Sequence, residues 1–95
     1  MSEPYTFRGF TIPAHMMPAL LRWTQNGEVP GDFLQAVIRN DLRAAVSHAD
    51  NENAANLPAY LGWFYNEAPC GCWGAPGCLT EWPGRLEAMR PKVAA

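Results

Sequence analysis

The amino-acid sequence predicts an all-α fold, a compact bundle of three main helices plus a short fourth helix, preceded by an extended N-terminal arm. Apolar residues recur at spacings of three and four through the middle of the chain, as on the buried face of a helix. Proline and glycine residues separate these stretches where helices begin and end. Because a 95-residue chain has room for one hydrophobic core, we expect a single domain over residues 1–95.

The N-terminal arm is expected to cover residues 1–12. Residues 5–12 alternate loosely between apolar and polar types and are rich in β-forming residues, which favours an extended chain. This arm would place Phe7, Phe10 and Ile12 on the core. A lone strand has no neighbour to pair with, so we predict no sheet.

The helical core is predicted over residues 13–82 and begins with Pro13 as a first helical residue. Its first helix should end at Asn26-Gly27, since glycine is favoured just beyond a helix. The second helix has the clearest pattern and is predicted to be continuous. Its apolar stripe contains Phe33, Leu34, Val37, Ile38, Leu42, Ala45, Val46 and Ala49.

Two further helices complete the predicted bundle. The polar residues 50–53 should end the second helix and cap the third. Pro58 should kink the third helix or mark its effective start, because proline lacks a backbone N–H. A short fourth helix from Pro76 is expected to break at Pro83-Gly84, and residues 83–95 to form a frayed tail.

The charge of the chain disfavours nucleic acid as a partner. Seven basic and nine acidic residues give a formal net charge of −2, whereas nucleic-acid-binding domains are typically basic. Arg39 and Arg43, one turn apart on the predicted second helix, form the one candidate basic patch. A nucleic-acid-binding regulator is therefore kept as an alternative function.

The sequence also predicts a cytoplasmic protein. No apolar run is long enough to span a membrane, and the N-terminus lacks the basic and apolar regions of a signal peptide. The three cysteines cannot all pair within one chain, so reduced thiols are expected.

Cys70, Cys72 and Cys78 follow a C-x-C-x5-C spacing that allows two interpretations. A structural zinc ion needs four ligands, so His48 or His15 would have to supply the fourth. The alternative is that the cysteines are small packing residues beside tryptophans, since free cysteine is often buried. We favour packing and predict no cofactor, and a small zinc-supported module remains an alternative.

The aromatic residues suggest a binding surface. Three of the four tryptophans lie between residues 60 and 82, and tryptophan and tyrosine are favoured as interface anchors. The predicted partner-binding residues are Trp63, Tyr65, Glu67, Trp73 and Trp82. In the alternative interpretation, all of these rings belong to the core.

No residue pattern indicates an enzyme. The chain has no nucleophile elbow, no glycine-rich phosphate loop and no H-E-x-x-H motif. Two polar pairs, Asn40-Asp41 and Asn66-Glu67, either support the turn at residues 70–77 from inside or form an acidic contact site outside. We therefore predict a protein without catalytic activity.

Two segments carry a resemblance to a known group of proteins. Residues 31–42 (GDFLQAVIRNDL) and 65–74 (YNEAPCGCWG) resemble a family of small accessory proteins of unknown role encoded by tailed bacteriophages and prophages. The resemblance spans roughly residues 12–82. It implies a phage protein that binds and inhibits or modulates a host bacterial protein, including defence systems of the CRISPR–Cas kind.

Overall fold

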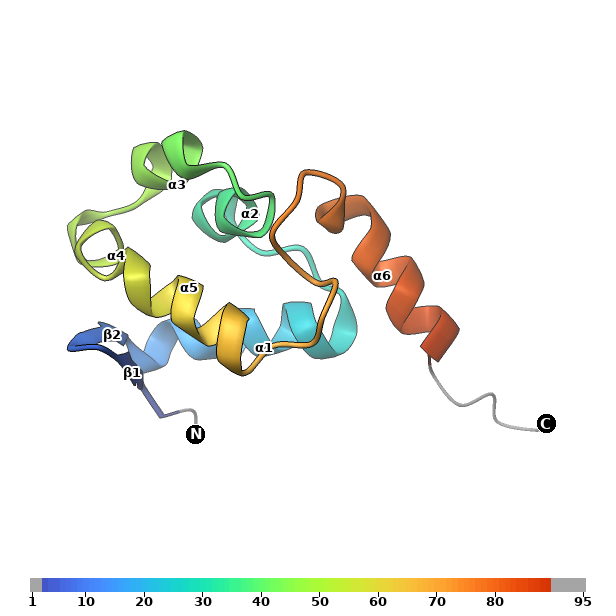
Figure 1. The fold of residues 1–95 in the computed structure, drawn as a ribbon, viewed down its shortest axis with the longest axis horizontal. Coiled ribbons are helices and arrows are strands. Elements are labelled where there is room, and N and C mark those ends of the chain that lie inside the picture. The colour runs from blue at the N-terminus through green and yellow to red at the C-terminus, as the bar shows by residue number, and fades with distance from the viewer. Residues whose placement is uncertain (1–2, 90–95) are drawn as a thin grey trace.

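The computed structural model describes residues 3–89 and shows a helical protein with one small antiparallel sheet (Figure 1). The elements in chain order are β1 (Tyr5–Phe7), β2 (Phe10–Ile12), the 3-10 helix η1 (Ala14–Met16), α1 (Met17–Asn26), α2 (Asp32–Ile38), α3 (Leu42–His48), α4 (Asn51–Ala55), α5 (Leu57–Asn66) and α6 (Cys78–Met89). The predicted helical class is confirmed. The arrangement differs from three main helices, because the predicted second and third helices are each divided in two.

The N-terminal arm is a β-hairpin, which corrects the prediction of an unpaired extended arm. Strand β1 pairs with β2, with Phe7 opposite Phe10 and Tyr5 opposite Ile12. Arg8 and Gly9 connect the strands with φ angles of 51° and 83°, as in the type I′ turns that suit two-residue hairpins. Ile12 is fully buried, whereas Phe10 is partly exposed. The strand therefore finds its missing neighbour in the same arm.

Helix α1 ends where its sequence predicts. Gly27 follows it with φ = 73°, and its N–H donates to the carbonyl of Trp23 at 3.0 Å. The glycine is required for a second reason, because a Cβ here would lie 3.1 Å from Cα of Pro83 in α6. Gly27 is therefore required both by its left-handed backbone conformation and by the close contact between α1 and α6.

The predicted second helix is broken between α2 and α3. Asn40 adopts a left-handed φ of 60°. Its N–H donates to the carbonyl of Val37, and the N–H of Asp41 donates to that of Ala36, which together form a Schellman motif. The carboxylate of Asp41 then caps α3 by accepting from the N–H of Ala44. The chain changes direction here, so the single stripe is divided between two helices.

This break moves part of the predicted stripe to the surface. Leu42 is 64% exposed and Val46 is 52% exposed, although both were predicted to lie in the core. Ala45 between them is buried. The prediction was wrong for Leu42 and Val46 because helical periodicity holds along a helix only while its axis is continuous.

Helix α4 is one short turn that leads into α5. Asp50 caps α4, and its carboxylate accepts from the N–H of Asn53 at 2.7 Å. Pro58 lies in the first turn of α5, so its predicted role as the effective start of a helix is confirmed. Asn56, between the two helices, accepts the N–H of Thr11 on its Oδ1 at 2.8 Å and so holds the hairpin.

Helix α6 continues through Pro83, which was predicted to end it. The helix extends to Met89, so residues 83–89 of the predicted frayed tail are helical, and the rest of that tail lies outside the described residues. Trp82, the residue before the proline, is buried with 1% exposure. The contacts of Trp82 and of Pro83 with α1 compensate for the N–H that proline lacks.

Two tryptophans form the centre of the core. The indole N–H of Trp82 donates to the carbonyl of Trp23, and the indole N–H of Trp23 donates to the carbonyl of Cys72, each at 3.0 Å. Tyr60 is also fully buried, and its hydroxyl donates to Oδ1 of Asn53. Burial, reinforced by the charges of Asp50 and Glu52, raises the pKa of Tyr60 above its ordinary range. The polar atoms of Trp23, Trp82 and Tyr60 therefore have hydrogen-bond partners inside the core.

We expect Phe64→Ala to destabilise the protein by about 3–5 kcal/mol, because Phe64 is 1% exposed and its removal leaves a cavity. The matched control is Val29→Ala, at a position that is 58% exposed. The control should change the free energy of unfolding by less than about 0.5 kcal/mol. Urea denaturation followed by circular dichroism measures both. Equal losses in the two variants would contradict this assignment of the core.

Glycine substitutions test the α1–α6 contact. Gly27→Ala should lower the free energy of unfolding by more than about 1 kcal/mol, because alanine opposes the positive φ and its Cβ crowds Pro83. Gly84→Ala, within α6 and with open space around the added methyl group, should instead raise it by about 0.5–1 kcal/mol. Thermal melts compare the two variants with the parent protein. A loss of stability in both would show that helix propensity does not govern position 84.

Candidate functional site

The loop of residues 67–77 connects α5 to α6 and is held at several points. Its Gly74 N–H donates to the carbonyl of Ile38 at the end of α2, at 2.8 Å. The carbonyl of Cys72 accepts the indole N–H of Trp23. Gly71 and Gly74 have φ angles of 94° and 99°, which favour glycine. These contacts give a loop without regular secondary structure a defined position.

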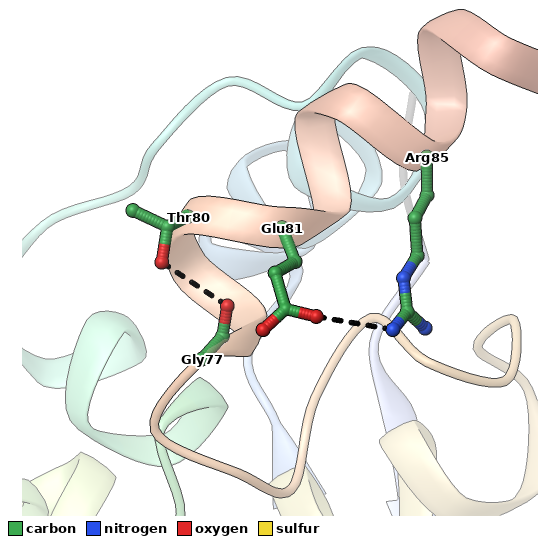
Figure 2. A network of polar contacts seen from close by, with 4 residues as sticks. All are labelled: Gly77, Thr80, Glu81 and Arg85. Atoms are coloured by element: carbon green, nitrogen blue, oxygen red, sulfur yellow. Dashed lines mark hydrogen bonds and ion pairs between the residues drawn. The ribbon is translucent and has the colours of Figure 1, made fainter.

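Helix α6 holds the same loop from the other side (Figure 2). Arg85 donates from Nη2 to Oε1 of Glu81 at 3.1 Å, one helical turn earlier, and Thr80 donates to the carbonyl of Gly77 at 3.2 Å. The guanidinium of Arg85 also lies against Gly71, where a Cβ would come within 2.7 Å of Nη1. The loop thus packs between α2 and α6.

Helix α5 has an inner and an outer apolar face. Ala59, Tyr60, Trp63 and Phe64 are buried on the inner face. On the outer face, Leu61 is 38% exposed and Tyr65 is 81% exposed. These two residues are four positions apart and therefore lie on the same side of the helix. Helix α5 therefore contributes to the core with one face and keeps an apolar face at the surface with the other.

The outer face of α5 forms one wall of a groove with a volume of about 360 Å³. The tip of the β1–β2 hairpin and the loop of residues 67–77 form its other walls. The lining residues, which we call the aromatic groove, are Phe7, Arg8, Pro58, Leu61, Gly62, Tyr65, Asn66 and Trp73. Segments far apart in the sequence thus build one concave and largely apolar surface.

The rings of the groove are held by specific contacts. The ring of Phe7 lies on the backbone of Gly62, where a Cβ would approach both Cδ atoms of the ring to within 2.7 Å. Trp73 stacks on the buried Phe64 with ring centroids 5.3 Å apart and an interplanar angle of 26°. Phe7 and Trp73 are therefore anchored in the fold and keep part of each ring at the surface.

The groove carries one cation. The guanidinium of Arg8 lies 4.9 Å from the ring centroid of Phe7, within the range of a cation–π contact. Within residues 3–89 this guanidinium forms no ion pair. Arg8 is exposed on the hairpin turn, so its charge is accessible to an anionic group at the end of the groove.

The structure separates the five predicted partner-binding residues into two groups. Tyr65 and Trp73 line the groove, and Glu67 is exposed just beyond the end of α5. Trp63 and Trp82 are 5% and 1% exposed and belong to the core, so they are not surface contacts. Trp63 packs edge-on against the buried Phe64, and the indole N–H of Trp82 donates a hydrogen bond to the carbonyl of Trp23 in α1. Spacing along the sequence does not distinguish rings that fill the core from rings that remain outside it.

The three cysteines are free thiols in different environments. Cys72 is fully buried, Cys78 is half-buried and Cys70 is exposed. Burial raises the pKa of the Cys72 thiol from 9.0 to about 12, and the nearby Cys78 and Cys70 add to this shift. Within the described residues, no group of three or more His, Cys, Asp or Glu side chains is arranged to hold a metal ion. His15 and His48 are exposed on η1 and α3.

The remaining candidate residues have structural surroundings. Arg39 and Arg43 do not share a helix, because Arg39 caps the end of α2 and Arg43 lies in α3. Arg39 forms an ion pair with Asp41, with Nη2 and Oδ2 3.6 Å apart. Asn40-Asp41 therefore ends one helix and caps the next. The predicted basic patch on one helix is not present.

Comparisons of the chain with protein-family models, with curated proteins and with solved structures found no match. The resemblance of residues 31–42 and 65–74 to phage accessory proteins therefore stays a prediction. No helix within residues 3–89 has the length and apolar character needed to cross a membrane.

Sequence reasoning missed the hairpin side of the groove. Phe7 and Arg8 were assigned to an extended arm, and Leu61 was not among the predicted partner-binding residues. The available signal was the Arg8-Gly9 pair between two β-forming triplets, which fits a two-residue turn. The position of that hairpin over Gly62 depends on tertiary contacts and has no local signal.

Cys72 is expected to make the protein less stable at alkaline pH. The unfolded thiol loses its proton near its ordinary pKa of 9.0, whereas the folded thiol keeps its proton until about pH 12. The unfolded state therefore binds fewer protons in this range, and stability should fall as the pH rises above 9. Urea denaturation from pH 8 to pH 11 should show a smaller fall for Cys72→Ala. The control Cys70→Ala should change the pH profile much less than Cys72→Ala does, because Cys70 is only the smallest contribution to the raised pKa of Cys72. Identical pH profiles of all three proteins would contradict the expected role of Cys72.

Proposed function

We propose that this protein acts without catalysis, by binding a partner protein in the aromatic groove. The observation that carries the proposal is the exposure of Tyr65, which leaves 81% of its surface accessible beside the concave surface formed by Leu61 and Trp73. Such amphipathic rings lose little conformational entropy on binding and form many interface hot spots. A groove with fixed walls adds to affinity because it needs little ordering.

The groove favours a particular kind of partner segment. Phe7, Leu61, Tyr65 and Trp73 offer apolar and aromatic contacts that suit proline or aliphatic side chains. Arg8 at the hairpin turn favours a carboxylate next to that apolar segment. The expected ligand is therefore an exposed apolar segment of a protein, flanked by an acidic residue.

The resemblance to phage accessory proteins supplies the biological context of the proposal. In that context the partner is a bacterial protein or complex of the host cytoplasm, and binding inhibits or modulates it, as an anti-defence factor of the anti-CRISPR type does. Small proteins of this kind act by occupying a surface of their target. An aromatic groove on a protein of 95 residues is compatible with that mode of action.

A pulldown from a lysate of the host bacterium tests the proposal. The tagged parent protein should recover one stoichiometric complex, and Tyr65→Ala should weaken that complex by at least about 2 kcal/mol, or about 30-fold in Kd. The thermal melting temperature should change little, because Tyr65 is mainly exposed. The recovered partner, once purified, allows Kd to be measured by calorimetry.

The matched control is Met89→Ala. Met89 is also an exposed apolar residue, at the end of α6, and it does not line the groove. This variant should bind the partner like the parent protein. Arg8→Glu should weaken binding and reduce its dependence on salt. Recovery of the same complex by all variants alike would place the binding surface outside the groove.

A further inference from the structure

The aromatic groove combines its rings with polar side chains that have no partner. Within residues 3–89, the hydroxyl of Tyr65, the side-chain amide of Asn66 and the indole N–H of Trp73 form no hydrogen bond. Tyr65 and Asn66 are exposed. In this part of the chain no buried polar side-chain atom lacks a partner, so the indole N–H of Trp73 also reaches the surface. The groove therefore offers hydrogen-bond donors as well as apolar contacts.

A ligand that uses both kinds of contact needs apolar side chains and free acceptors. Tryptophan, tyrosine and asparagine side chains all donate hydrogen bonds to backbone carbonyls. A segment in the polyproline II conformation has no internal hydrogen bonds, so its carbonyls remain open, and proline-rich segments of this form dock in aromatic-lined grooves. The rings of Phe7, Tyr65 and Trp73 provide such a lining.

Other backbone conformations match the groove less completely. In an α-helix the backbone carbonyls already accept from N–H groups four residues further on, so the donors of the groove find few main-chain partners there. An added β-strand needs the free edge of a sheet along which to pair. The hairpin contributes Phe7 and Arg8, at its turn, to the groove lining. The groove thus presents the end of the hairpin and not the length of a strand.

Arg8 adds a requirement for charge. Its guanidinium lies 4.9 Å from the ring centroid of Phe7, is exposed on the hairpin turn and forms no ion pair within the described part of the chain. An acidic residue next to the prolines brings a carboxylate to this cation, whereas a basic residue there meets a like charge. Charge complementarity therefore favours a proline-rich segment with an acidic neighbour.

We propose that the aromatic groove binds a proline-rich segment in the polyproline II conformation, with an acidic residue beside the prolines. This inference rests on the proposed function, because it names the chemistry of the partner at the same groove. In the bound state the rings pack on the prolines, and the donors of Tyr65, Asn66 and Trp73 bond to backbone carbonyls of the segment. Such a segment is extended before it binds, so its ordering costs little entropy.

Two synthetic peptides test the proposal with the full-length protein. The first has an aspartate pair followed by about eight prolines, which span about 25 Å as a polyproline II helix. The second has the same aspartates followed by an equal number of leucine and alanine residues. Fluorescence anisotropy should show at least about tenfold tighter binding of the proline peptide. In nitrogen-15 NMR spectra this peptide should also shift the indole N–H signal of Trp73, which is identified by its loss in Trp73→Phe.

Substitutions that remove one donor and keep the ring separate hydrogen bonding from packing. Trp73→Phe keeps a ring beside Phe64, and Tyr65→Phe removes a hydroxyl alone. Each should raise the Kd of the proline peptide about three- to tenfold, as expected for the loss of one hydrogen bond. The matched control is Tyr5→Phe, at a half-buried tyrosine that does not line the groove. This control should bind like the parent protein.

The role of charge is tested with a third peptide, in which asparagines replace the aspartates. Arg8→Gln should weaken binding of the aspartate peptide and leave binding of the asparagine peptide unchanged. The matched control is Arg43→Gln, at an exposed arginine that forms no ion pair within residues 3–89 and does not line the groove. It should bind both peptides like the parent protein.

Two results would overturn the proposal. The first is a proline peptide that binds no more tightly than the leucine–alanine peptide, or does not bind at about 1 mM. The second is unchanged affinity for the proline peptide in both Trp73→Phe and Tyr65→Phe. If the host complex still depends on Tyr65 in either case, the groove remains the binding surface and only the proline-rich ligand is wrong. If Tyr65→Ala leaves the host complex intact, the proposed function fails as well.

Discussion

A chain of two indole hydrogen bonds holds together parts of the protein that are distant in sequence. Trp82 of α6 donates to the carbonyl of Trp23 in α1, and Trp23 donates to the carbonyl of Cys72 in the loop before α6. All three residues are buried, so each N–H needs a partner inside the protein. The carbonyl of Trp23 also accepts the N–H of Gly27. The end of α1, the loop and α6 are therefore positioned by one set of contacts.

The candidate binding surface depends on this arrangement. With Cys72 held against Trp23, the next residue, Trp73, stacks on Phe64 and forms one side of the aromatic groove. The opposite side is the hairpin, which Gly62 admits because it has no side chain. The same residues that stabilise the core thus place the exposed rings. If the groove binds a partner as proposed, we expect walls held in this way to need little ordering, which lowers the entropy cost of association.

Local signals in the sequence determined the helical class and several helix ends. The stop at Gly27, the cap at Asp50 and the start near Pro58 follow from backbone chemistry that acts within a few residues. The enrichment of large rings between residues 60 and 82 likewise drew attention to Tyr65 and Trp73, which line the aromatic groove.

Tertiary contacts decided the rest. The left-handed turn at Asn40 divided an otherwise regular stripe and brought Leu42 to the surface. Burial of Trp82 against α1 and the contact of Pro83 with Gly27 maintained α6 through a proline. The pairing of β1 with β2 formed a hairpin, and the position of this hairpin over Gly62 made Phe7 and Arg8 part of the groove lining. The physical reason is that periodicity records which residues are apolar, whereas the choice between core and surface depends on which other segments pack against them.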